Sequence, residues 1–327
     1  MTPPIGLLVM AYGTANGPDD IERYYTDIRG GRAPSPEHLA ELKERYAAIG
    51  NQFPLLEITR GQAAGLEAEL NASAADGESF RAYLGMKHSP PFIPEAVSAM
   101  RTEGIDRAVG IVMAPHWSGM SVESYLERVE TAADDGGPSF AFVRHFHDHP
   151  MFVTFLAGRV AHALGELMPA ELDGAAVIFS AHSLPVRILE DGSQRCTLCT
   201  ACETSCRYRD GLQETADLVA KDLGLGHHVI AWQSAGRTAD PWWGPPIELV
   251  IADLAAEGHP AVVVCSAGFV ADHLEILYDL DVEARHIADE AGIHFVRTEM
   301  PNADPAFVKV LAAVVRDELD RSLPAEP

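Results

Sequence analysis

The stretch AAVIFSAHSLP, residues 175–185, has the pattern of a buried strand that ends in small and polar residues. Its apolar run is short and carries no charge, which is typical of a strand covered on both faces. GLLVMAYGT, residues 6–14, has the same form, and AVGIVMAPHWS from Ala108 is similar to AVVVCSAGFVAD from Ala261. The two halves of the chain therefore echo each other, and the repeat predicts two similar lobes.

Short apolar runs alternate with longer amphipathic stretches, which is the pattern of parallel sheets flanked by helices. We expect strands at 6–11, 80–84, 108–113, 175–180, 228–232 and 261–266. Helices are expected at 36–49, 59–70, 93–101, 122–133, 150–164, 212–223, 246–256 and 305–319, with another from His273. The fold class is α/β, with two Rossmann-like lobes at 1–149 and 150–327. The second lobe should carry a cysteine insert at 190–210 and a C-terminal helix.

The composition limits the partners of this 327-residue chain. Acidic residues outnumber basic ones by 48 to 24, so nucleic acid and anionic membranes should be repelled over most of the surface. An anionic ligand would need a local basic patch. No apolar stretch is long enough to cross a bilayer, and the start lacks the pattern of a signal peptide. We expect a cytoplasmic protein, with a monomer as the simplest state.

Polar side chains gather where the predicted strands end, which is where ligands bind in open parallel sheets. These residues are Tyr12, His88, His116, His182 and, one turn into a helix, Glu275. A neutral imidazole at His182 could hold a divalent metal or accept a proton near neutral pH. A histidine that only bonds to a loop fits the local pattern equally well.

The segment GFVADHLEILYDLDVEARH, residues 268–286, supplies a line of carboxylates. On a helix that begins near Asp272, residues Glu275, Asp279 and Glu283 would recur at every fourth position and form one stripe. Such oxygen ligands suit a weakly held, hydrated divalent metal in transit. A solvated acidic face explains the same spacing.

Four of the five cysteines lie within CTLCTACETSC, at Cys196, Cys199, Cys202 and Cys206. This C-x2-C-x2-C-x3-C spacing favours a soft metal or a cluster over disulfides. We predict a [2Fe-2S] cluster, with structural zinc or a [4Fe-4S] cluster as alternatives. The histidine-rich runs RHFHDHP and GHH are expected to be solvent-exposed side chains with no metal.

A resemblance to a known family covers nearly the whole chain. In family order, from Gly6 to Phe307, these motifs are similar to those of ferrochelatases: LLVMAYGT, IERYYTDIRGG, LKERYAAIG, GMKHSPPFI, APHWS, SVESY, FSAHSLP, WQSAGRTADPWWGP, GFVADHLEILYD and EMPNADPAF. The start of the chain resembles the Gram-positive type, which makes coproheme from coproporphyrin III. The resemblance implies a chelatase-like fold, with Fe(II) and coproporphyrin III as substrates. Protoporphyrin IX, another metal such as cobalt or nickel, and a non-enzymatic cluster-bearing haem or metal carrier stay open.

The resemblance also implies roles for individual residues. His182 and Glu275 would flank the macrocycle and bind Fe(II), and His182, if largely neutral, would take pyrrole protons. Asp279 and Glu283 match the family's metal path. Positions that match contacts of the ring or its propionates are Tyr12, Tyr25, Arg29, Arg45, Tyr46 and Tyr125, with His88 near the cleft. Gly30 and Phe53 depart from the family pattern, which leaves the propionate contacts uncertain.

Overall fold

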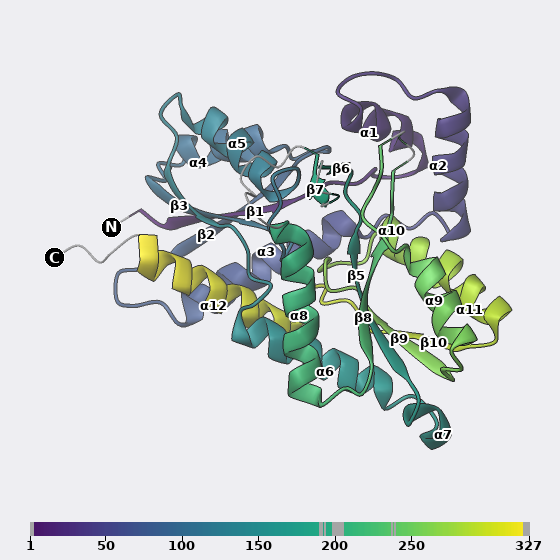
Figure 1. The fold of residues 1–327 in the computed structure, drawn as a ribbon. Coiled ribbons are helices and arrows are strands. Elements are labelled where there is room, and N and C mark those ends of the chain that lie inside the picture. Colours follow the sequence, from purple (N-terminus) through teal and green to yellow (C-terminus); the bar gives the residue numbers. More distant parts are fainter. Residues whose placement is uncertain are drawn as a thin grey trace.

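The computed structural model describes residues 3–189, 192, 194–197, 206–236, 238 and 240–322. Its centre is two four-stranded sheets (Figure 1). The first, in the order β2-β1-β3-β4, contains β1 (Ile5–Ala11), β2 (Phe80–Met86), β3 (Arg107–Val112) and β4 (Ser139–Val143). The second, in the order β10-β9-β5-β8, contains β5 (Ala176–His182), β8 (His228–Gln233), β9 (Ala261–Cys265) and β10 (His294–Arg297). All neighbouring strands in both sheets are parallel, which confirms the predicted α/β class with two similar lobes.

Helices flank both sheets. They are α1 (Ile21–Ile28, after the short 3-10 helix Pro18–Asp20), α2 (Pro36–Ala48), α3 (Leu55–Ala72), α4 (Ile93–Thr102), α5 (Val122–Ala133), α6 (Pro150–Leu164), α7 (Pro169–Leu172), α8 (Arg207–Leu223), α9 (Ile247–Ala256), α10 (Leu274–Leu277), α11 (Arg285–Ala291) and α12 (Pro305–Ser322). Among the described residues, no helix is both long and apolar enough to cross a bilayer.

The strands are buried on both faces because successive side chains point to opposite sides of a sheet. Leu7 and Val9 of β1 join the core with α3 and α12, whereas Leu8 and Met10 join the core with α4 and α5. The second sheet is built alike, with α6 and α8 on one face and α9 and α11 on the other. This two-sided burial explains why the central strands are continuous apolar runs.

The two lobes share part of their packing. Helix α12, drawn in yellow in Figure 1, contacts α3 and β4 of the first lobe as well as α6. One apolar cluster contains both Val9 of β1 and Phe179 of β5. The C-terminal helix therefore packs against elements of both lobes.

The helix expected from His273 is not a regular α-helix. Helix α10 ends at Leu277, a π-helix follows at Asp279–Ala284, and α11 continues from it. The carbonyl of Tyr278 accepts hydrogen bonds from the amides of Val282 at 3.1 Å and Glu283 at 3.0 Å. Because a π-helical turn is wider than an α-helical one, Glu275, Asp279 and Glu283 do not share one regular α-helical face.

The described part of the cysteine insert is ordered around two cysteines. An antiparallel pair, β6 (Val186–Ile188) and β7 (Gln194–Cys196), lies outside the two large sheets, and Cys206 is the N-cap of α8. The side chains of Cys196 and Cys206 are both buried in the main apolar cluster. The other two cysteines of the motif, Cys199 and Cys202, lie outside the described residues.

Candidate active site

His182 and Glu275 come together at the carboxyl end of the second sheet. His182 is the last residue of β5, and its Nε2 lies 3.6 Å from Oε2 of Glu275 in α10. The same carboxylate oxygen lies 3.6 Å from Nε2 of His273. Glu275 therefore stands between two imidazoles, one of which the sequence had not indicated.

Close packing beneath this pair fixes its position. The amide of Gly268, after β9, donates to the carbonyl of Ser180 at 3.0 Å. A Cβ at Gly268 would lie 2.5 Å from the Cβ of Ala181, so only glycine allows this approach. The side chain of Gln233, at the end of β8, donates to the carbonyl of Glu275 at 3.0 Å. Three neighbouring strand ends thus hold His182 and Glu275 in place.

His182 and Glu275 form an ion pair. Burial alone would lower the pKa of His182, but the charge and hydrogen bond of Glu275 raise it to about 9. Burial would also raise the pKa of Glu275, yet His182 and His273 hold it well below its ordinary value. The ring of His182 is additionally oriented by a contact between Nδ1 and the carbonyl of Ser183. The condition set above for proton acceptance, a largely neutral His182, is therefore not met while Glu275 is its ion-pair partner.

Asp279 lies behind the pair and is almost fully buried. Its carboxylate contacts the guanidinium of Arg45 from α2 and the hydroxyl of Ser234. Burial raises the pKa of Asp279 to about 6, although Arg45 opposes this rise. The charges of Glu275 and Glu283 raise it further, so the three carboxylates lie near one another despite the π-helix. Glu283 itself is exposed.

Tyr12 comes from the first lobe and faces this region. Its side chain is 42% exposed, and its ring packs against His88 with centroids 4.6 Å apart. Burial raises the pKa of Tyr12, and the charge of Glu275 raises it further, which places the two side chains in one electrostatic environment. Nδ1 of His88 lies 2.7 Å from Oδ1 of Asp27, so His88 is held by α1.

The other predicted ring contacts divide into two groups. Tyr25 and Arg29 of the α1 region are partly exposed, with the guanidinium 5.8 Å from the Tyr25 ring centroid. Nε of Arg29 is buried and has no hydrogen-bond partner among the described residues. Tyr46 and Tyr125 are instead buried in apolar clusters. Because the rings of Tyr46 and Tyr125 are buried, they can only pack behind the exposed residues of the site.

Two basic residues near Tyr12 had not been singled out from the sequence. Nζ of Lys87 lies 4.9 Å from the Tyr125 ring centroid, and burial lowers the pKa of Lys87 to about 8. Arg128 of α5 donates to the carbonyl of Lys87 at 2.7 Å, and its charge lowers the pKa of Tyr12. Lys87 lies within the GMKHSPPFI motif next to His88, so its position was a usable signal.

Comparison with known proteins identifies the family. A family model described as Ferrochelatase matches residues 4–319. The coproporphyrin III ferrochelatase of Anoxybacillus flavithermus is 46% identical over 317 residues, covering 96% of each chain. That of Bacillus subtilis is 45% identical over 319 residues, covering 97% of this chain and 98% of the relative. The chain belongs to the ferrochelatase family. The resemblance expected from the motifs is thereby confirmed.

Solved structures of other chelatases share the ferrochelatase fold seen here. SirB from Bacillus subtilis with Fe3+ has a TM-score of 0.59 at 10% identity and covers 98% of both chains. The sirohydrochlorin chelatase SirB from Bacillus subtilis subspecies spizizenii, in complex with cobalt, has a TM-score of 0.56 at 9% identity, covering 98% of this chain and 97% of that one. At such low identity these likenesses concern the fold alone.

In this ferrochelatase-family chain, Cys196 and Cys206 lie beside each other. Sγ of Cys196 and Sγ of Cys206 are 3.0 Å apart, and the hydrogen bond between them lowers the pKa of Cys206 to about 6. Tyr208 lies two residues after Cys206, and its hydroxyl donates to the carbonyl of His182 at 2.9 Å. The start of α8 therefore touches both the cysteines and the His182 backbone.

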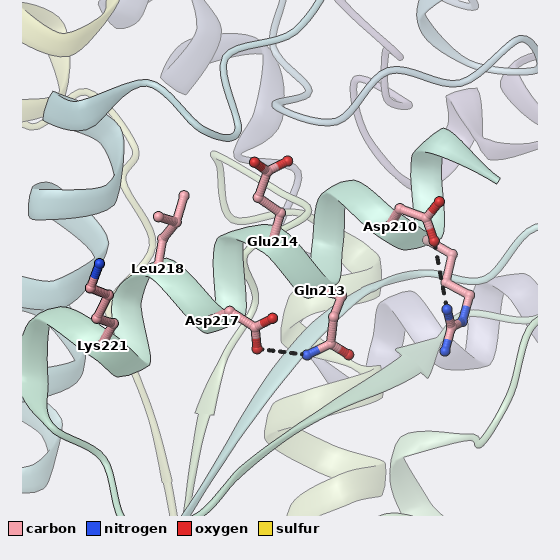
Figure 2. Close-up of a pocket in the computed structure, with 7 residues that line it drawn as sticks. Asp210, Gln213, Glu214, Asp217, Leu218 and Lys221 are labelled. Atoms are coloured by element: carbon pink, nitrogen blue, oxygen red, sulfur yellow. Dashed lines mark hydrogen bonds and ion pairs between the residues drawn. The ribbon is translucent and has the colours of Figure 1, made fainter. Parts of the chain in front are cut away.

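A separate hollow of about 360 Å³ lies over the outer face of α8 (Figure 2). Its lining is mostly polar or charged and includes Gln213, Asp217 and Lys221. None of the residues that the sequence predicts to bind iron or porphyrin lines it. This hollow is therefore not the place where the family's chemistry would occur.

Proposed function

We propose that this chain is an enzyme that inserts Fe(II) into coproporphyrin III to form coproheme, with His182 and Glu275 as the metal-binding pair. The observation that carries the proposal is their 3.6 Å approach at the sheet edge, with Tyr12 of the other lobe in the same electrostatic environment. Two chain-length relatives at 46% and 45% identity are named coproporphyrin III ferrochelatases. A carrier of a cluster would not need this histidine and carboxylate pair.

Metal insertion requires two protons to leave the pyrrole nitrogens as Fe(II) enters the ring. Glu275 is ionised and can hold the cation, while His182 must lose its proton before it can bind metal or accept a proton. His273 contacts the same carboxylate and is a second imidazole at the site. We assign proton acceptance to this His182, Glu275 and His273 group, because both imidazoles lie 3.6 Å from the same carboxylate oxygen.

Fe(II) would reach the pair past Glu283 and Asp279. An exposed carboxylate at the outer end can capture a hydrated cation, and the buried Asp279 can pass it to Glu275. Arg45 pairs with Asp279, so we place it in this path and not on a propionate. Its charge keeps the path from holding the cation too tightly.

Coproporphyrin III carries four carboxylates, and its binding needs cations near the aromatic faces. Arg29, Lys87 and Arg128 lie around Tyr25, Tyr12 and Tyr125 and can supply them. Tyr12 would cover one face of the ring, and His88 would hold Tyr12 in place.

The proposal is tested by anaerobic incubation of the purified protein with Fe(II) and each porphyrin. Formation of coproheme should be faster than formation of protohaem from protoporphyrin IX. His182→Ala and Glu275→Gln should each abolish measurable insertion. Preferential turnover of protoporphyrin IX would contradict the substrate, and full activity of either variant would contradict the site.

We further propose that Cys196, Cys199, Cys202 and Cys206 hold a [2Fe-2S] cluster. The thiols of Cys196 and Cys206 fit a shared site, since two sulfur ligands that each lie about 2.3 Å from one tetrahedral metal are about 3.8 Å apart. The observed 3.0 Å separation requires only a small widening, and Cys206 is readily ionised. When bound, the cluster would cross-link the insert to α8 and could register redox state. Cys206→Ser should remove the cluster's visible absorption and lower the melting temperature, whereas an equally coloured variant would contradict the ligand set.

We also propose a cytoplasmic location, a monomeric state, and a division into lobes between residues 149 and 150.

A further inference from the structure

A second cluster of metal-ligating side chains lies away from the His182 pair. His145, His147 and Asp148 follow β4 in the connection to α6, and one donor atom of each lies within 4.8 Å of the others. Nδ1 of His145 is 3.4 Å from Oδ1 of Asp148. The expectation that these histidines are solvent-exposed holds for His145, but only 12% of the His147 side chain is exposed.

Helix α8 closes the other side of this cluster. Oε2 of Glu214 lies 3.2 Å from Nε2 of His147, and in Figure 2 the Glu214 side chain points away from the side chains of Gln213 and Asp217. A Cβ at Gly211 would lie 3.2 Å from the same nitrogen, so the helix backbone approaches the imidazole closely. A carboxylate from a segment distant in sequence therefore reaches one member of the three-residue cluster.

The site is held in place before any ligand arrives. The hydroxyl of Thr215 on α8 donates to the carbonyl of His147 at 3.1 Å, and Phe146 anchors the connection in the core. The His147 ring packs between His116 and His145, with centroid separations of 5.2 Å and 5.1 Å. Its Nδ1 is buried and has no hydrogen-bond partner among the described residues.

We propose that His145, His147 and Asp148 bind a Zn2+ ion, with Glu214 as fourth ligand or as the acceptor that orients His147. Zinc bonds to nitrogen and oxygen are about 2.0–2.1 Å long, so the ligands of a tetrahedral site lie about 3.3 Å apart. The observed 3.4 Å and 3.2 Å separations already match this spacing. Two imidazoles also select zinc over Mg2+ and Ca2+, which take oxygen ligands.

Such an ion would clamp the connection between the lobes to α8, the helix that starts at the cysteines and contacts His182. This role is separate from porphyrin metallation, and the proposal does not depend on the activity assigned above.

Titration calorimetry with Zn2+ tests the proposal on the full chain. The His182→Ala, Glu275→Gln double variant serves as background, because it removes the other histidine and carboxylate site. Adding His145→Ala and Asp148→Asn should lower the bound zinc by one equivalent, whereas adding His162→Ala should not. His162 is a matched control, since it is an exposed histidine with a nearby carboxylate, Glu166.

Both substituted side chains are well exposed, so the variants should fold. Zinc should also raise the melting temperature of the background and not that of the His145→Ala, Asp148→Asn derivative. Equal zinc stoichiometry in those two proteins, or an equal loss in the His162→Ala control, would overturn the proposal. In the otherwise unaltered enzyme, His145→Ala with Asp148→Asn should leave iron insertion unchanged.

Discussion

Replacing Glu275 by glutamine should lower the pKa of His182 from about 9 to its ordinary value of 6.5 or below. The carboxylate lies 3.6 Å from Nε2 and is the main influence that opposes burial. Glutamine keeps the shape and removes the charge, so burial then acts with less opposition. A change from 9 to 6.5 corresponds to about 3 kcal/mol. Solvent at the exposed third of the ring screens part of this, so the least change we expect is about 1.5 pH units.

The consequence for metal binding is large. With a pKa of about 9, His182 is neutral in about 1% of molecules at pH 7, whereas a pKa of 6.5 makes about three quarters neutral. The assay is an NMR titration of histidine-labelled, metal-free protein, with His182→Ala used to assign the resonance. Asp279→Asn is the control, because the charge of Asp279 is the smallest of the influences on His182. A His182 that titrates near 6.5 in the unaltered protein, or at an unchanged pH in Glu275→Gln, would refute the ion pair.

Three further outcomes follow from the same contacts. Tyr208→Phe removes a 2.9 Å hydrogen bond to the carbonyl of His182, which is worth about 1 kcal/mol. Iron insertion should slow about fivefold in steady-state kinetics, while the cluster's absorption persists. An unchanged rate would show that Tyr208 has no positioning role. Gly268→Ala forces a Cβ against Ala181 and should lower the free energy of unfolding by about 1–3 kcal/mol in denaturant titrations, a cost that would be absent if the strand ends could separate freely. His182 binds its proton more tightly in the folded protein than in the unfolded chain. Its contribution to the free energy of unfolding is therefore complete below pH 6.5 and is lost as the pH rises through about 9. Denaturation at several pH values should show this loss, and Glu275→Gln should lack most of it.

The central strands were predictable because they are buried on both faces. An apolar run such as AVVVC has no other environment in a globular protein. Strands β4 and β10 were not predicted. They lie at sheet edges and have five and four residues, so neither contains a comparable continuous apolar run. Helix α1, eight residues long with two buried positions, was missed for the same reason.

The places of the candidate residues in the fold were predictable from the sequence, but their contacts were not. Strand ends and the family motifs placed His182 and Glu275 at one edge, although 92 residues separate them in the sequence. The ion pair between Arg45 and Asp279 joins α2 to the π-helix, and no local pattern announces a contact of that range. The π-helix could not be predicted, because its sequence has the periodicity of an ordinary α-helix and only the backbone hydrogen bonds distinguish the two.

The ion pair also bears on the order of events at the proposed metal site. In the unliganded protein, the proton on His182 neutralises Glu275, and Arg45 neutralises Asp279. Fe(II) that reaches Glu275 replaces the proton as the partner of the carboxylate, which lowers the pKa of His182 because two positive charges now lie side by side. Metal arrival would therefore release the proton and leave a neutral imidazole beside the ring. On this reasoning the enzyme cannot accept pyrrole protons at His182 until the metal has arrived, so metal delivery and ring deprotonation are one coupled step.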